Sequence, residues 1–110
     1  MTNKSPFYWL AIATGSLTLA TAAQAESTAN VESLQTKVLA AACANCHGTD
    51  GRTSGAIPSI AGRPAFVLES KLQAFKRGED QDATVMSRHA SGYTDEELAA
   101  LAQYFSNLGR

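Results

Sequence analysis

The stretch that decides the fold is Cys43-Ala44-Asn45-Cys46-His47, in which two cysteines frame two residues and a histidine follows at once. This pattern is the attachment signature of c-type haem. Each thiol adds to one vinyl group of the haem, and the two intervening residues let both sulfurs reach the same porphyrin edge. We therefore predict one covalent haem c, attached through Cys43 and Cys46, with His47 as an axial ligand of the iron.

Other uses of paired cysteines fit this sequence less well. A Cys-x-x-Cys redox pair usually belongs to a thioredoxin-like fold near a strand-helix-strand unit, and the sequence has no strand-like alternation. A structural zinc site needs four ligands, and beyond the N-terminal segment only Cys43, Cys46, His47 and His89 are available. A disulfide is compatible with an exported protein, but the loop it would close is too short to stabilise much.

The N-terminal segment has the pattern of an export signal. Lys4 is followed by an uncharged stretch over residues 5–25, which ends in the small-x-small pattern Ala-Gln-Ala read by signal peptidase. An uncleaved anchor would need about twenty mostly apolar residues, and this stretch is interrupted by several polar residues and a glycine. We predict a signal peptide, residues 1–25, a periplasmic location, no membrane association after cleavage, and one domain over residues 26–110.

The charge of the chain excludes some partners. The sequence carries 9 basic and 10 acidic side chains, and removal of the leader with Lys4 leaves 8 against 10, a net charge of −2. Nucleic-acid binding requires a basic patch, and none is present. A domain of this size has a marginal core and often depends on a metal, a disulfide or a cofactor. We expect the haem to supply that stabilisation.

The spacing of apolar residues predicts an all-α domain of three or more short helices joined by long loops. The predicted helices cover residues 31–43, with Asn30 as N-cap, residues 64–77, and residues 95–108. Gly78 is placed to end the second helix, and Thr94 begins the third as part of a capping box with Glu97. The segments between them, residues 48–62 and 79–91, are predicted loops, and long loops in a small domain usually wrap something functional.

The sixth ligand of the iron is predicted to be Met86. An electron carrier with histidine on one side of the iron needs a second axial ligand, and a His/Met pair raises the potential. Met86 is the only methionine left after the leader is removed, although a methionine more often fills a core. His89, three residues later, is the competing ligand if residues 85–90 form a helical turn. With both axial positions filled, the haem would not be a catalyst.

The order of these features resembles class I cytochrome c over residues 31–108. That order is an N-terminal helix, the attachment motif, a Gly/Pro loop, a methionine segment and a C-terminal helix with an aromatic residue near its end. The resemblance implies that the first and last helices cross, and that the carbonyl of Pro58 accepts a hydrogen bond from the ring of His47. The helix crossing would involve Leu39, Ala42, Leu101, Ala102 and Phe105.

Several short motifs are most similar to the haem subunit of flavocytochrome c sulfide dehydrogenase. They are Cys-His-Gly-Thr-Asp-Gly at 46–51, Pro-Ser-Ile-Ala-Gly at 58–62, Phe-Lys-Arg-Gly-Glu at 75–79, Thr-Val-Met at 84–86 and Gly-Tyr at 92–93. This similarity implies a flavoprotein partner that oxidises sulfide, with the chain as its electron acceptor and not catalytic alone. Soluble cytochromes of the c4 and c5 type share some of these motifs, so a free periplasmic shuttle is the alternative. A haem sensor or a peroxidase-like enzyme would need an open sixth position.

The residues around the predicted haem edge also bear on the partner. In class I cytochromes the exposed edge lies beside the attachment segment and the methionine segment. A free shuttle usually carries a ring of one charge for steering, whereas a permanent subunit buries an apolar patch. The small or apolar residues here favour a permanent subunit; they are Ala44, Ile57, Ala61, Val85 and Ala90, with only Arg52, Arg63 and Arg88 as scattered charges.

Overall fold

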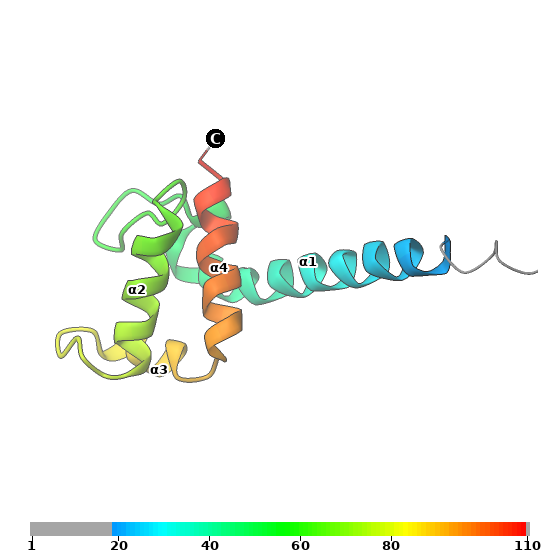
Figure 1. Ribbon diagram of the computed structural model, residues 1–110. Helices are drawn as coiled ribbons and strands as arrows, with labels where there is room; N and C mark the ends of the chain where they lie inside the picture. Colours follow the sequence, from blue (N-terminus) through cyan, green and yellow to red (C-terminus); the bar gives the residue numbers. More distant parts are fainter. Residues whose placement is uncertain (1–18, 110) are drawn as a thin grey trace, which may run out of the picture.

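A computed structural model describes residues 19–109 of the chain, and all regular structure in that range is helical (Figure 1). The prediction of an all-α fold is confirmed. The elements are α1 (Leu19–His47), the short 3-10 helix η1 (Thr49–Gly51), α2 (Ala65–Lys76), α3 (Thr84–Ala90) and α4 (Asp95–Asn107). Most of the predicted signal peptide, residues 1–18, lies outside the described residues.

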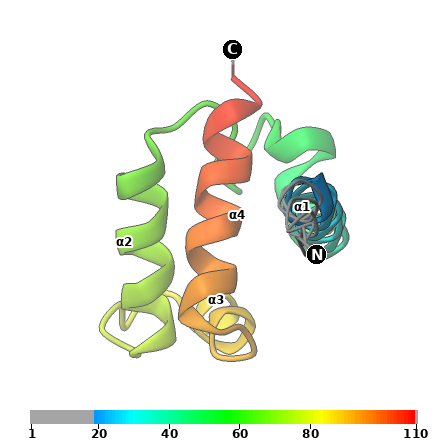
Figure 2. The same ribbon diagram turned by 45° about the vertical axis from the view of Figure 1, so that its right-hand side comes forward.

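Helix α4 is the centre of the packing, and both α1 and α2 lie against it (Figure 2). Its apolar residues recur at intervals of three and four, which places them along one face of the helix. These residues form the core together with apolar residues from the other helices. The buried apolar residues are Ala40, Leu68, Ala90, Leu98, Leu101, Ala102 and Phe105. The expected contact between the first and last helices is therefore present, through Leu39, Ala40 and Cys43, whereas Ala42 lines a pocket beside it.

The start of α4 is fixed by the predicted capping box, which is confirmed. The Thr94 hydroxyl accepts a hydrogen bond from the Glu97 backbone N–H at 3.2 Å, and the Glu97 carboxylate accepts one from the Thr94 N–H at 2.9 Å. These bonds satisfy two donors that a helix start would otherwise leave unpaired. Acidic residues in the first turn add a favourable interaction with the helix dipole.

The predicted start of the first helix is wrong. Helix α1 begins at Leu19 and continues through Asn30, so Asn30 is an interior residue and not an N-cap. The segment before it is rich in alanine and other good helix formers and holds neither proline nor glycine, so nothing in it ends a helix. No helix within residues 19–109 is both long enough and apolar enough to cross a membrane.

The apolar spacing in the middle of this helix also does not mark a core face. Val31, Leu34 and Val38 are 62%, 61% and 73% exposed. Helix α1 has 29 residues and α4 has 13, which correspond to about 44 Å and about 20 Å at 1.5 Å per residue. The outer part of α1 therefore extends beyond its packing partner, as Figure 1 shows.

The segment that carries Met86 is also different from the prediction. Residues 79–91 are predicted to form a polar loop, but Thr84–Ala90 form helix α3. This agrees with the alternative of a helical turn over residues 85–90. Ala83 precedes the helix without a side-chain cap, so the sequence has no start signal there. The helix is instead held by its contacts with α2 and by Ala90, which is 1% exposed.

Helix α2 ends as predicted. Gly78 has a φ of +68°, a conformation that glycine adopts without steric cost. The Gly78 N–H donates to the carbonyl of Phe75, and the Glu79 N–H donates to that of Ala74, both at 3.0 Å. These two bonds form a Schellman motif, which satisfies carbonyls at the helix end. The helix starts at Ala65, one residue after Pro64.

The long loop after η1 is held by hydrogen bonds to one carbonyl. The carbonyl of Gly51 accepts bonds from the Ile60 N–H at 2.9 Å, the Ala61 N–H at 3.2 Å and the Ser59 hydroxyl at 2.9 Å. The Gly62 N–H then donates to the carbonyl of Phe105 in α4 at 2.9 Å. These contacts fix the end of the loop, including the neighbouring Pro58, against the rest of the fold.

Candidate haem site

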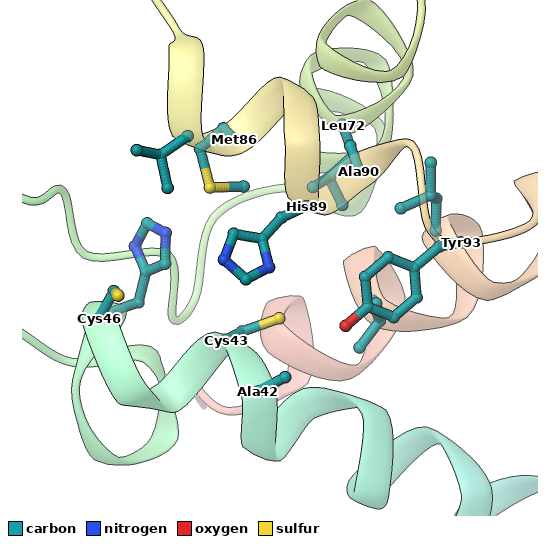
Figure 3. Close-up of a pocket in the computed structure, with 12 residues that line it drawn as sticks. Ala42, Cys43, Cys46, Leu72, Met86, His89, Ala90 and Tyr93 are labelled. Atoms are coloured by element: carbon teal, nitrogen blue, oxygen red, sulfur yellow. The ribbon is translucent and has the colours of Figure 1, made fainter.

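The residues of the attachment motif line a pocket between the helices (Figure 3). Most of the lining side chains are apolar. Helix α1 contributes Ala42, Cys43, Cys46 and His47, helices α2 and α4 contribute Leu72, Leu98 and Leu101, and the α3 region contributes Val85, Met86, His89, Ala90 and Tyr93. An apolar pocket with a few placed polar groups suits a large hydrophobic cofactor.

The two cysteines lie on the last turns of α1, on the side of the pocket opposite α3 (Figure 3). Residues three apart share a helix face, so both thiols reach the same pocket. Neither forms a disulfide within the described residues; Cys43 is partly buried and Cys46 is exposed. Burial raises the pKa of the Cys43 thiol, partly offset by a hydrogen bond with the backbone. The pair therefore presents two sulfur atoms along one edge of the pocket.

His47 is the buried residue at the end of α1, with 7% of its surface exposed. Its Nδ1 lies 2.7 Å from the carbonyl oxygen of Pro58. A carbonyl can only accept, so Nδ1 carries a proton and donates, and in the neutral ring it is Nε2 that has the lone pair. A hydrogen bond of this kind fixes the tautomer and the ring orientation of a metal-binding histidine. The free ring nitrogen of His47 is thus suited to bind a metal within the pocket that this residue lines.

Helix α3 brings two more candidate ligands to the pocket. Met86 is partly buried and His89 is exposed, and both side chains extend from α3 toward α1 (Figure 3). Their spacing of three residues places them on one face of the helix. The sequence prediction named both, but it placed Met86 on a loop.

Two pocket residues were not foreseen as such from the sequence. Leu72 was expected only on the apolar face of its helix, and Tyr93 only next to the start of α4. Tyr93 is partly buried in the pocket wall, and desolvation raises the pKa of its hydroxyl, with smaller contributions from Cys43 and Glu97. Its aromatic ring before a capping box was the signal in the sequence, because an apolar residue at that position usually packs inward.

Comparison with protein families identifies the domain. Residues 35–109 match the model of the cytochrome c family. The chain belongs to the cytochrome c family. Its attachment motif of Cys43, Cys46 and His47 implies one covalent haem c, and the pocket fits that group because it combines apolar walls, two thiols and a histidine with a free nitrogen. As a cytochrome c, the protein transfers electrons.

Several curated relatives are named as cytochromes or as electron acceptors. The chain is 49% identical over 74 residues, 67% of its length, to the cytochrome subunit of sulfide dehydrogenase of Chlorobaculum tepidum, of which the match covers 66%. It is 38% identical to cytochrome c-554(548) of Halomonas halodenitrificans over 59% of this chain and 82% of that protein. It is 35% identical to the thiosulfate dehydrogenase electron acceptor of Stutzerimonas stutzeri over 62% of this chain and 33% of that protein. The match thus spans just under two thirds of the sulfide dehydrogenase subunit and a third of the thiosulfate dehydrogenase acceptor.

Proposed function

We propose that this cytochrome c is the electron-transfer subunit of a periplasmic sulfide dehydrogenase and accepts electrons from a flavoprotein subunit. The observation that carries the proposal is the 49% identity to a cytochrome subunit of sulfide dehydrogenase, over a match that takes in 67% of the chain. The predicted signal peptide, residues 1–25, supports export, since c-type cytochromes receive their haem after translocation.

The proposal assigns a role to each site residue. Cys43 and Cys46 attach the haem, His47 binds the iron through Nε2, and Met86 binds it from α3. The Pro58 carbonyl orients His47 through the 2.7 Å hydrogen bond and makes its ring a stronger ligand. When bound, the haem supplies one-electron transfer. Two protein ligands to the iron would leave no open position for oxygen or substrate, which favours a carrier over an enzyme.

An apolar surface beside the site supports docking to another protein. Ile57, the neighbour of Pro58, is 43% exposed, and Val85 borders the pocket. The sequence suggested that Ala90 belongs to this surface. Ala90 is only 1% exposed, so this expectation is wrong. Interfaces of permanent complexes are largely apolar at their centre, and the chain has no excess of basic residues for electrostatic steering.

The second candidate function is that of a free periplasmic shuttle. The observation that favours it is that the match covers 82% of cytochrome c-554(548), so a domain like this one makes up most of that protein. Both functions use the same haem and the same ligands. They differ in whether the cytochrome is bound permanently to a flavoprotein or moves freely to an oxidase or another redox enzyme.

The experiment mixes the haem-loaded protein with the flavoprotein subunit of a sulfide dehydrogenase and follows haem reduction after addition of sulfide. We expect the two proteins to elute together with flavin and haem, and reduction to be fast. An unrelated class I cytochrome serves as the control. No stable complex, together with reduction no faster than in the control, would favour the free shuttle.

The ligand assignment has its own readout in the unmutated protein. The oxidised protein should show the weak sulfur-to-iron absorption band, and the reduced protein should not bind carbon monoxide. Carbon monoxide binding by the unmutated protein would contradict two protein ligands and would favour a sensor or an enzyme.

A further inference from the structure

Helix α3 presents two side chains that can bind iron to one pocket. Met86 and His89 both line it, and both extend toward α1 (Figure 3). Thioether and imidazole are each established axial ligands of haem iron. The proposed function uses only Met86, so His89 is a ligand-type side chain in the pocket without an assigned role.

The side chain of His89 is free to move. Within residues 19–109 it makes no hydrogen bond and no ion pair. The ring of His47, by contrast, is buried and held by Pro58. The neighbouring Arg88 is exposed and does not line the pocket. Reorientation of the His89 ring therefore breaks no contact of the fold.

The helix that carries both residues is weakly anchored at its start. It has seven residues, and Ala83 before it supplies no side-chain cap. Its end is the fixed part, because Ala90 is buried in the core. His89 lies next to that fixed end, and Met86 lies nearer the weakly held start.

We propose that His89 is a reserve ligand that takes the sixth position of the haem iron whenever the bond to Met86 is lost. This inference rests on the proposed role of Met86. In the exchange the bond between iron and the Met86 sulfur breaks, and a lone pair of the neutral His89 ring forms the new bond, with no electron transferred. Nitrogen is a harder donor than a thioether, so the exchange is more favourable for ferric than for ferrous iron. Its consequence is that the iron stays closed to exogenous ligands.

The test compares Met86→Ala with Met86→Ala/His89→Ala, both with haem attached. We expect Met86→Ala to lose the sulfur-to-iron band and to give the low-spin electron paramagnetic resonance signal of two nitrogen ligands. The double variant should be high-spin and bind carbon monoxide. In the reduced state Met86→Ala should bind carbon monoxide at least about tenfold more weakly than the double variant. The reason is that His89 would occupy the iron in Met86→Ala, so the form with an open sixth position would be about a tenth of the population or less.

Matched controls separate His89 from its surroundings. Met86→Ala/Arg88→Ala changes the adjacent exposed side chain of the same helix and should behave like Met86→Ala. A high-spin Met86→Ala protein that binds carbon monoxide as strongly as the double variant would overturn the inference.

A second measurement covers the case in which Met86→Ala does not assemble. The oxidised unmutated protein and His89→Ala are warmed until the sulfur-to-iron band disappears. We expect the unmutated protein to pass to a low-spin nitrogen-ligated form and His89→Ala to pass to a high-spin form; a high-spin form in both would overturn the inference. Absence of the sulfur-to-iron band in the unmutated protein at room temperature would instead contradict the proposed role of Met86, which is a separate failure.

Discussion

The ring nitrogen Nδ1 of His47 lies 2.7 Å from the carbonyl oxygen of Pro58. One backbone carbonyl, eleven residues along the chain, thus fixes the tautomer of the histidine and leaves its other nitrogen for the metal. The position of that carbonyl depends on the loop, because Ser59 and Ile60 are bonded to Gly51 immediately after Pro58. The loop is therefore part of the site although it contributes no metal ligand.

The first prediction follows from this hydrogen bond. Pro58→Gly keeps the carbonyl but frees the backbone, so the bond to His47 should weaken and the ring should donate less electron density to the iron. We expect a higher reduction potential, measured by redox titration. Pro64→Gly is the control, because Pro64 does not contact His47. Both variants should lose on the order of 1 kcal/mol of stability, because glycine makes the unfolded chain more flexible. Only Pro58→Gly should change the reduction potential, and an equal change in both variants would contradict the prediction.

The second prediction concerns Gly51, which has a φ of +72°. A Cβ atom there would lie 2.7 Å from Ile60 Cγ1 and 2.9 Å from Phe105 Cδ1. Gly51→Ala should therefore add overpacking to the backbone strain and cost on the order of 2 to 4 kcal/mol in unfolding free energy. Gly78→Ala is the control, with a φ of +68° and no atom within 4 Å of the added carbon. Denaturant unfolding of the haem-loaded proteins measures both, and equal losses would argue against overpacking.

The third prediction concerns removal of the haem. The pocket wall is apolar, and without haem it would face water, while the buried core consists of few side chains, several of them alanines. Cys43→Ala/Cys46→Ala should abolish covalent attachment and lower the helix content and cooperativity of unfolding. Acid-acetone extraction and circular dichroism measure the two effects. Each single cysteine variant is the control and should retain one covalent bond, and a cooperative thermal transition in haem-free protein would contradict the stability argument.

The fourth prediction uses the pair of Lys76 and Asp95, whose charged atoms are 2.5 Å apart. The hydrogen bond from Lys76 holds the pKa of Asp95 below its usual value. A lowered pKa in the folded state means that the carboxylate stabilises the fold above its unfolded pKa, and that this stabilisation disappears as the pH falls through the folded pKa. Asp95→Asn should therefore lower the melting temperature slightly at neutral pH, and the difference from the unmutated protein should vanish in acid.

The control for this pair is Glu96→Gln. Glu96 lies in the same first turn of α4, but it makes no ion pair among the described residues. Its substitution should lower the melting temperature less at neutral pH. A difference for Asp95→Asn that persists unchanged in acid would show that the carboxylate charge is not its cause.

The site was predictable from the sequence to the extent that its residues are adjacent or follow known signals. Cys43, Cys46 and His47 are nearly contiguous, so their common position on α1 required no knowledge of the fold. Helix α4 was predictable because its capping box and its apolar spacing agree. The contact between His47 and Pro58 was expected only from the resemblance to class I cytochrome c, since nothing local in the sequence links the two residues.

The errors have physical causes. The helix that carries Met86 has no capping residue and depends on tertiary contacts, which the sequence does not display. The spacing of Val31 and Leu34 resembles a core face. However, α1 has 29 residues and its partner α4 has 13, so part of α1 has no helix packed against it. Apolar periodicity predicts which residues share a face, whereas burial also depends on what lies opposite.

The last prediction concerns docking to the flavoprotein through the apolar surface beside the haem. Ile57 is 43% exposed, does not line the pocket, and precedes the proline whose carbonyl holds His47. Ile57→Asp would place a charge within the proposed apolar interface, so we expect flavoprotein binding to weaken by about 1.4 kcal/mol or more, roughly tenfold in Kd. The absorption spectrum should stay unchanged, which checks that the haem site is intact. Val31→Asp is the matched control, because Val31 is also exposed but lies on the outer part of α1.

The salt dependence of docking is the second measurement. Binding of the unmutated protein should persist at moderate salt, because salt screens charge interactions and affects an apolar interface little. Binding that disappears there, with equal effects of both substitutions, would favour a mobile carrier steered by charge.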